Sequence, residues 1–417
     1  MLSRGRRPVA IDLFAGAGGL SLGFEQAGFN VVAAVEADPI HASVHKFNFP
    51  QSVVLVQDLS NYPGSQLVSQ VNKSLAKAGS TLIGQVDALI GGPPCQGFST
   101  GGIRDAHDER NTLLLEFVRL VEEIRPLSFC FENVSGLLER RFQNIREQAA
   151  DRLVNAGYAI SGLDQVENCI EFGIPQTRRR VIALGVLGST PPPRPTPVSD
   201  RTTVADAFEG LPQLSRYPEL LATDEVQLSK ADLLLRSTAT GSFARCLSGV
   251  DRSETDFSTP RVWDPGKLSN SKLTRHRLAT IRRFASTNQG ETEPKSRLYR
   301  LPVDGTSRTL RAGTGADRGS HTSPRPIHPT EDRVITVREA ARLQGFPDWF
   351  RFHATNWHGH RQVGNSVPPP LAKAAGAALM QAMGMEPRFP EREQRLGEDK
   401  LLKYSKASAL LEMHQYL

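Results

Sequence analysis

The chain has 417 residues, of which 39% are hydrophobic and 23% charged, and its formal net charge is +6. This composition is typical of a soluble globular protein with a sizeable core and about two domains. No apolar run approaches the length of a membrane span and no signal-peptide pattern opens the chain, so we expect a cytoplasmic protein. The basic balance is compatible with a nucleic-acid partner without establishing one.

The first chemical signal is a glycine-rich turn. Val9 to Phe14 predicts a strand, and Ala15 to Gly19 then leads into a helix that includes Leu20 to Glu25. Glycines allow the backbone to approach a ligand closely, and a helix N-terminus offers free N–H donors. Such a turn is typical of nucleotide sites, but the strict spacing of dinucleotide-binding turns is absent, which argues against NAD. An ordinary strand–helix connection is an equally good interpretation of this turn alone.

Further apolar runs predict strands at Val31 to Val35, Val53 to Val56, Val86 to Ile90, Leu127 to Phe131 and Val181 to Gly185. Helical patterns alternate with them, which favours an α/β fold with a doubly wound, mostly parallel sheet. Three acids and a thiol lie at or just after successive strand ends: Glu36, Asp58, Cys95 and Glu132. One such acid is usually solvated or a helix cap, but four groups at the rim where these folds bind ligands indicate a functional site.

The apolar run that ends at Ile90 is followed by two glycines and two prolines, Gly91 to Pro94, and then by Cys95. A rigid loop beyond a strand end is a suitable place for a nucleophile, although an isolated cysteine is more often a buried core residue. The other cysteines, Cys130, Cys169 and Cys246, form no CxxC pair with it or each other, so we expect no metal.

An arginine cluster precedes the last predicted strand. If this segment is extended, Gln176, Arg178 and Arg180 point to one side. Two guanidinium groups on one face suit an anion or a base carbonyl, whereas most arginine clusters are solvated surface.

A proline-rich stretch at Pro191 to Pro195 ends the regular pattern and predicts a domain boundary. We expect a first domain over 1–195 and an irregular, smaller domain over 196–358, whose basic residues between Lys267 and Arg311 suit phosphate contacts and base readout. We expect a returning segment over 359–387, with an apolar helix packed on the first sheet. The charged tail over 388–417 is assigned no function. Its leucines, which could form a surface helix, are Leu401, Leu402, Leu410 and Leu411.

With these residues identified, the chain resembles the DNA (cytosine-5) methyltransferases, typically bacterial modification enzymes. The resemblance covers Ala10 to Met383 except roughly Ser199 to Asp304, which is where this family varies its target-recognition segment. Matching segments occur in the family's order at 12–19, 92–99, 131–134, 176–180, 336–347 and 364–369. The resemblance implies a methyltransferase fold with a target-recognition domain, S-adenosylmethionine as methyl donor, double-stranded DNA as substrate and no metal.

The resemblance also implies roles for single residues. The Cys95 thiolate would add to carbon 6 of cytosine and make carbon 5 electron-rich, while Glu132 would supply a proton at ring nitrogen 3. Asn133 would orient the loop, Arg180 would hold the base carbonyl, and Arg178 would organise Cys95 and Glu132. Gln176 completes the expected catalytic group.

The donor pocket follows in the same way. Phe14 would pack on the adenine, Glu36 would accept from the ribose hydroxyls, and Asp58 would accept from the adenine amine. The expected turn and wall residues of this pocket are Gly16, Gly18, Gly19, Leu20, Leu59, Pro94, Leu113, Asn365 and Ser366.

The target base must leave the duplex to reach Cys95, at a cost of roughly a few kcal/mol. We expect a monomer, and a restriction endonuclease as a possible functional partner. Two other functions stay open: cytosine-5 methylation of tRNA, and DNA binding without catalysis. The basic segment favours duplex DNA over tRNA, and the complete set of Cys95, Glu132 and Arg180 argues against an inactive protein.

Overall fold

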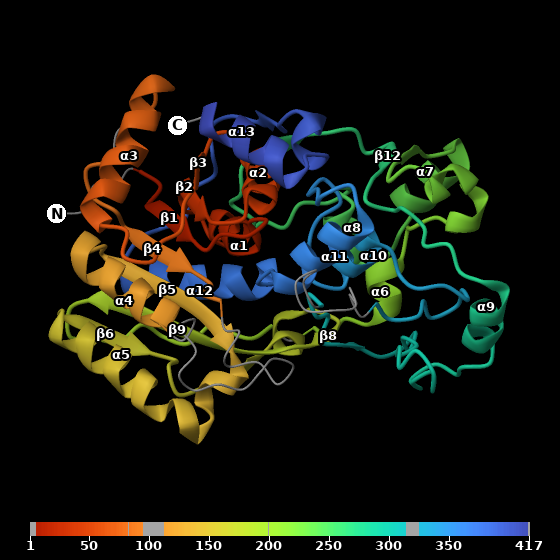
Figure 1. The fold of residues 1–417 in the computed structure, drawn as a ribbon, viewed down its shortest axis with the longest axis horizontal. Helices are drawn as coiled ribbons and strands as arrows, with labels where there is room; N and C mark the ends of the chain where they lie inside the picture. The colour runs from red at the N-terminus through yellow and green to blue at the C-terminus, as the bar shows by residue number, and fades with distance from the viewer. Residues whose placement is uncertain (1–5, 82, 95–111, 199, 314–324, 416–417) are drawn as a thin grey trace.

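The computed structural model describes residues 6–81, 83–94, 112–198, 200–313 and 325–415 (Figure 1). Cys95 and the rest of its loop to residue 111 lie outside the described residues. Among the helices that are described, none combines the length and apolar character needed to span a bilayer.

The core of the fold is an eight-stranded sheet with the order β3-β2-β1-β4-β5-β9-β6, and β7 also pairs with β9. Its strands are β1 (Val9–Leu13), β2 (Asn30–Glu36), β3 (Val53–Val56), β4 (Ala88–Gly91), β5 (Ser128–Val134), β6 (Tyr158–Ser161), β7 (Glu167–Asn168) and β9 (Arg179–Leu187). Strands β1 to β5 are parallel, and β9 is antiparallel to β5, β6 and β7. The doubly wound, mostly parallel α/β fold predicted from the sequence is confirmed.

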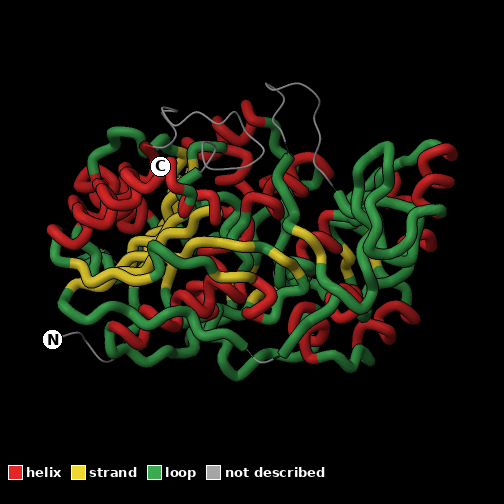
Figure 2. The backbone as a smooth tube through the Cα atoms, turned by 90° about the horizontal axis from the view of Figure 1, so that it is seen from below, coloured by secondary structure: helices red, strands yellow, loops and turns green. Residues whose placement is uncertain are grey.

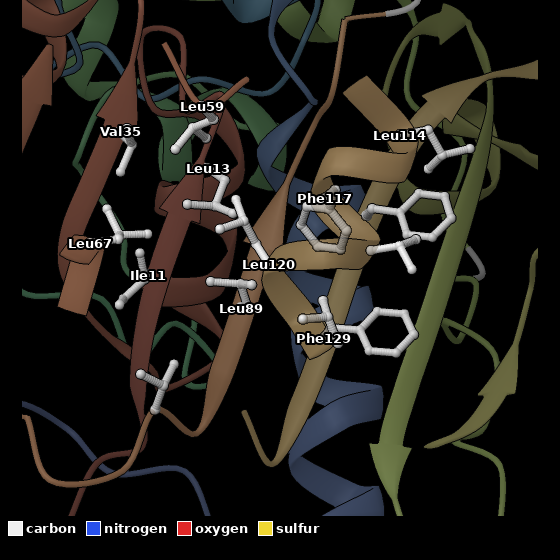
Figure 3. Close-up of a cluster of buried hydrophobic side chains, with 14 of the residues drawn as sticks. Ile11, Leu13, Val35, Leu59, Leu67, Leu89, Leu114, Phe117, Leu120 and Phe129 are labelled. Atoms are coloured by element: carbon white, nitrogen blue, oxygen red, sulfur yellow. The ribbon is translucent and has the colours of Figure 1, made fainter. Parts of the chain in front are cut away.

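Helices cover both faces of this sheet. One apolar cluster joins the sheet to α3 (Gly64–Lys77), α4 (Thr112–Ile124) and α5 (Gln143–Asn155). The other joins it to α1 (Gly19–Gln26) and α12 (Pro369–Ala382). Alternation along β1 explains the division, because Ile11 and Leu13 enter the first cluster and Ala10 enters the second (Figure 3).

Helix α12 returns to pack directly against α1. Both helices use glycine at the contact: a Cβ at Gly23 would lie 2.3 Å from the Cβ of Ala372, and one at Gly376 would lie 2.7 Å from that of Ala27. The small residues therefore allow the two backbones to approach closely and complete the second face of the sheet.

The remaining elements are short and joined by long loops (Figure 2). The helices are α6 (Val204–Phe208), α7 (Lys230–Ser237), α8 (Ser242–Leu247), α9 (Leu278–Ala285), α10 (Val337–Arg342) and α11 (Asn356–Asn365). The strands are β8 (Gln176–Thr177), β10 (Val226–Gln227), β11 (Arg261–Val262), β12 (Lys267–Leu268), β13 (Ser307–Arg308) and β14 (Gln394–Arg395). Figure 1 places α7 and α9 at the end of the molecule remote from the sheet.

One apolar cluster crosses the boundary expected near residue 196. Phe47 and Phe49, at the end of α2 (Pro39–Asn48), pack with Phe346, Phe350 and Phe352. Residues around 335–352 therefore share a core with the first part of the chain, although the sequence grouped them with the irregular domain.

The C-terminal tail is also part of the folded body. Leu401 and Leu402 are buried, and Met413 of α13 (Lys406–Gln415) is buried beside Ala42 and Val54. Leu411 is 73% exposed. The expected surface helix therefore includes only Leu410 and Leu411, because Leu401 and Leu402 precede α13 and are buried.

The close α1–α12 contact yields a stability prediction. Gly23→Ala should lower the free energy of unfolding by about 1–3 kcal/mol, because the new methyl group has no room beside Ala372. Gly84→Ala is the matched control, since a Cβ there meets nothing within 4 Å. Urea unfolding of both variants measures the difference, and equal midpoints would contradict the proposed close packing.

Candidate active site

The candidate site lies at the edge where the parallel strands end. Glu36 ends β2, Gly92 follows β4, and Glu132 and Asn133 lie near the end of β5. Because β9 is antiparallel, its first residues reach the same edge, and Arg180 pairs with Val134. The topology thus brings acids, a glycine turn and an arginine from distant parts of the sequence together.

The glycine turn after β1 is tightly enclosed. Gly18 has φ +103°, and a Cβ there would lie 2.5 Å from a ring carbon of Phe49. A Cβ at Gly19 would lie 2.3 Å from the carbonyl oxygen of Val367. Phe14 and Gly16 also have positive φ, at 56° and 57°. Gly18 caps α1 without a side-chain hydrogen bond. The backbone N–H of Ser21 bonds to Asp12, so the other N–H groups of the first turn are the ones that can serve a ligand.

Glu36 is held by two backbone donors. The N–H of Gly16 donates to Oε2 at 2.8 Å, and the N–H of Asp38 donates to Oε1 at 2.9 Å. Each carboxylate oxygen keeps a further lone pair. Glu36 is therefore oriented by the glycine turn and retains the capacity to accept from ribose hydroxyls.

The other residues expected around the donor differ in exposure. Asp58, Pro94 and Asn365 are exposed, and Phe14 and Leu113 are half-buried. Leu20 and Leu59 are 3% and 2% exposed, with side chains in the apolar clusters, so backbone groups are what they can offer a ligand. Ser366 is buried, and its hydroxyl donates to the carbonyl of Gln362 at 2.7 Å.

Glu132 and Arg180 form an ion pair across β5 and β9. Arg180 Nε lies 2.5 Å from Glu132 Oε1, and each side chain is 11% exposed. A Cβ at Gly92 would lie 3.5 Å from Glu132 Oε2, so the carboxylate lies against the loop that leads to Cys95. Asn133 Nδ2 donates to the carbonyl of Pro93 in the same loop at 3.4 Å.

Gln176 and Arg178 connect this edge to the irregular part of the chain. Arg178, 1% exposed, donates to the carbonyls of Leu310, Gly364 and Ser366 at 2.9, 3.0 and 3.0 Å. Gln176 accepts from the N–H of Leu310 at 2.9 Å, and β8 pairs in parallel with β13. The sequence could not predict that Arg178 would bind these three carbonyls, because every residue has a backbone carbonyl and no local pattern shows which ones a distant side chain will contact.

Cys95 lies outside the described residues, so its role as nucleophile stays a prediction. Of the three described cysteines, Cys246 is exposed, and the buried pair Cys130 and Cys169 offer no good substitute. Burial raises the pKa of the Cys130 thiol, and it raises the pKa of Cys169 to about 11. Both side chains are fully buried, so neither is available as a thiolate to an incoming base.

Sequence analysis missed a buried polar group beside the turn. Asp12 in β1 and Ser21 in α1 are fully buried and hydrogen-bonded, and His45 of α2 contacts Ser21. The signal was present, since Asp12 is the one charged residue in an otherwise apolar strand. In the described part of the chain, no group of three or more His, Cys, Asp or Glu side chains is arranged to hold a metal ion.

Comparisons with known proteins agree with this geometry. Residues 9–381 match the family model of the C-5 cytosine-specific DNA methylases. The chain is 45% identical over 97% of its length to the type II methyltransferase M.XorII of Xanthomonas oryzae pv. oryzae, covering 92% of that protein. It is 31% identical to M1.HphI of Haemophilus parahaemolyticus, over 89% of this chain and 86% of that one.

A solved structure is similar throughout. A prophage protein from E. coli, assigned as a DNA modification methyltransferase, superposes with a TM-score of 0.72 at 34% identity, covering 90% of this chain and 99% of that one. The Dnmt2 methyltransferase of S. pombe shares the fold at a TM-score of 0.54 and 15% identity, covering 91% of this chain and all of that one. The chain therefore belongs to the C-5 cytosine-specific DNA methylase family.

Proposed function

We propose that this enzyme transfers a methyl group from S-adenosylmethionine to carbon 5 of a cytosine flipped out of a specific duplex DNA sequence, through a transient bond to Cys95. The Glu132–Arg180 pair, which lies against Gly92 at the same edge of the sheet as the glycine turn, is the observation that carries this proposal.

The residues present fit a nucleoside donor. The positive φ angles of the turn, the uncapped first turn of α1 and the doubly anchored Glu36 make a cradle whose donors and acceptors match a ribose and an amino-acid tail. When bound, S-adenosylmethionine supplies an electrophilic methyl group. The residues that would hold it are Phe14, Gly16, Gly18, Gly19, Leu20, Glu36, Asp58, Leu59, Pro94, Leu113, Asn365 and Ser366.

The ion pair matches one edge of cytosine. The carbonyl oxygen at position 2 and the ring nitrogen at position 3 are neighbours, as Arg180 and Glu132 are. Arg180 would donate to the carbonyl, and Glu132 would place a proton at the ring nitrogen. Addition of the Cys95 thiolate to carbon 6 would then push electron density to carbon 5, which takes the methyl group. Loss of the carbon 5 proton and of the sulfur would restore the ring.

The exposed basic residues of the irregular part support a duplex substrate. Those between residues 267 and 311 are Arg275, Arg277, Arg282, Lys295, Arg297, Arg308 and Arg311. Other arginines of the same stretch have partners within the protein: Arg300 is buried and donates to the carbonyl of Phe284, and the half-buried Arg283 pairs with Glu293 at 3.1 Å. The exposed set would contact phosphates and offset the cost of extruding the base.

The similarity to type II methyltransferases supports a place in a restriction–modification system. Methylation would then protect host DNA from a cognate endonuclease. The DNA-methyltransferase family also favours DNA over tRNA as the substrate of this chain.

A conservative substitution tests the base-binding pair. Arg180→Lys should lower the single-turnover methylation rate on the order of 10²-fold, because a single ammonium replaces the guanidinium held beside Glu132. Arg179→Lys is the matched control, since that neighbouring side chain is exposed and should keep nearly full activity. Tritiated methyl transfer to plasmid measures both, and equal rates for the two variants would contradict the assignment of Arg180.

Substrate class is tested separately. Bisulfite sequencing of DNA from cells expressing the chain should reveal 5-methylcytosine at one recurring sequence, and purified enzyme should label plasmid and leave tRNA unlabelled. Labelling of tRNA alone would transfer the proposal to RNA, and tight DNA binding without any transfer would indicate a non-catalytic protein.

A further inference from the structure

Helix α13 of the C-terminal tail packs against α2 and β3 (Figure 1). Met413 of this helix has no solvent exposure and belongs to a small apolar cluster. The other buried members come from the glycine turn, β2, α2 and β3, and they are Ala15, Ala34, Ala42 and Val54. Because these neighbours are alanine and valine, the longer and flexible methionine side chain fills much of the space between them.

This cluster lies next to all three residues that are expected to recognise the nucleoside of the donor. Ala15 directly follows Phe14 in the glycine turn. Ala34 lies two residues before Glu36 in β2, so both side chains are on the same face of the sheet. The last residue of β3 packs against the cluster and lies two residues before Asp58. One apolar cluster therefore supports the expected contacts to both adenine and ribose.

Ala15 also fixes the turn through its backbone. Its N–H donates to the carbonyl of Val35 at 3.1 Å, and its carbonyl accepts from the N–H of Gly18 at 3.0 Å. The preceding Phe14 has φ 56°, a conformation that a residue other than glycine keeps only where its surroundings enforce it. The packing of the Ala15 methyl group in the cluster with Met413 is part of those surroundings.

The tail has its own attachments to the rest of the protein. The N–H of Gly397 donates to the carbonyl of Phe47 at 2.8 Å, and β14 pairs with β11. Lys400 lies 3.1 Å from Glu412 of α13. These contacts hold the helix in place without using a residue of the donor pocket, so α13 can act as a fixed support for the turn.

We propose that α13 is part of the donor site and that Met413 is a positioning residue for the nucleoside half of the donor. The inference rests on the proposed donor pocket. Met413 acts through Ala15 and the ends of β2 and β3: if its packing is lost, the turn spends less time in the conformation that binds the donor, and the apparent affinity falls in proportion. Glu132 and Arg180 lie outside this cluster, so the chemical step at saturating donor is unaffected.

Substitution of Met413 in the full chain tests the proposal. Met413→Ala leaves a cavity, so the Kd and the KM for S-adenosylmethionine should rise about tenfold while kcat at saturating donor stays within about twofold. Met413→Leu keeps most of the volume and should restore values close to wild type. Calorimetric titration gives Kd, and tritiated methyl transfer to plasmid gives KM and kcat.

Leu220→Ala is the matched control for a loss of stability. Leu220 is also fully buried in a small apolar cluster, but this cluster belongs to the irregular part of the chain and contains no residue of the proposed donor pocket. The variant should lower the free energy of unfolding and keep the wild-type Kd for the donor. An equal rise in Kd for Leu220→Ala and Met413→Ala, or a lower kcat with unchanged KM for Met413→Ala, overturns the proposal.

Hydrogen exchange of the wild type with and without S-adenosylmethionine needs no variant to fold. Coupling between two sites is reciprocal, so donor binding should slow the exchange of amides in α13, while those in the remote α7 should not change. Unchanged exchange in α13, or a wild-type Kd for Met413→Ala, overturns the inference and leaves the donor pocket intact. If the wild type binds no S-adenosylmethionine, the donor pocket itself is wrong and this inference falls with it.

Discussion

The ion pair between Glu132 and Arg180 depends on the direction of one strand. Had β9 continued the parallel pattern, its first residues would lie at the opposite edge of the sheet, far from the end of β5. Because β9 is antiparallel, Arg180 pairs with Val134 and its guanidinium reaches Glu132. The proposed base site is therefore a consequence of sheet topology. The glycine turn after β1 falls at the same edge because β1 runs parallel to β4 and β5.

Buried arginines join the remaining segments to this edge. Arg178 donates to three carbonyls, one just after β13 and two at the C-terminal end of α11. Farther away, Arg342 donates twice to Asp348, and Arg236 donates to the same carboxylate at 2.8 Å. These guanidinium groups hold the pKa of Asp348 far below its usual range. Removing one partner from such a buried set typically costs about 3–5 kcal/mol, because it leaves a charge uncompensated.

The contacts of Arg342 with Asp348 suggest a structural role for one of the segments that resemble the family, residues 336–347. Residues 336–347 include the capped helix α10, where Thr336 and Glu339 make a reciprocal capping box. Burial acts against ionisation of Glu339, but the Arg333 guanidinium and the cap hydrogen bonds lower its pKa to about 2. The segment therefore serves to lock the irregular part of the chain onto the core, and its resemblance to the family reflects packing.

The sequence predicted the sheet, its glycine turn and the acids at strand ends, because these depend on local alternation and on glycine and proline. It placed Glu36 and Glu132 at one rim, and the family resemblance gave Arg180 a role at the base; the structure brings Glu132 and Arg180 into contact. It missed the acceptors of Arg178 and the burial of Asp12, Ser21 and His45, since these depend on contacts between segments far apart. It also separated residues 335–352 from the first domain, because composition does not reveal which phenylalanines share a core.

The most direct test of the central claim is mass-spectrometric mapping of a trapped enzyme–DNA adduct. Duplex DNA carrying 5-fluorocytosine at the target position cannot lose a proton from carbon 5, so the covalent intermediate should accumulate in the presence of S-adenosylmethionine. The account predicts that the modified peptide contains Cys95. A modification on Cys130, Cys169 or Cys246, or complete methyl transfer to ordinary cytosine by Cys95→Ser, would contradict it.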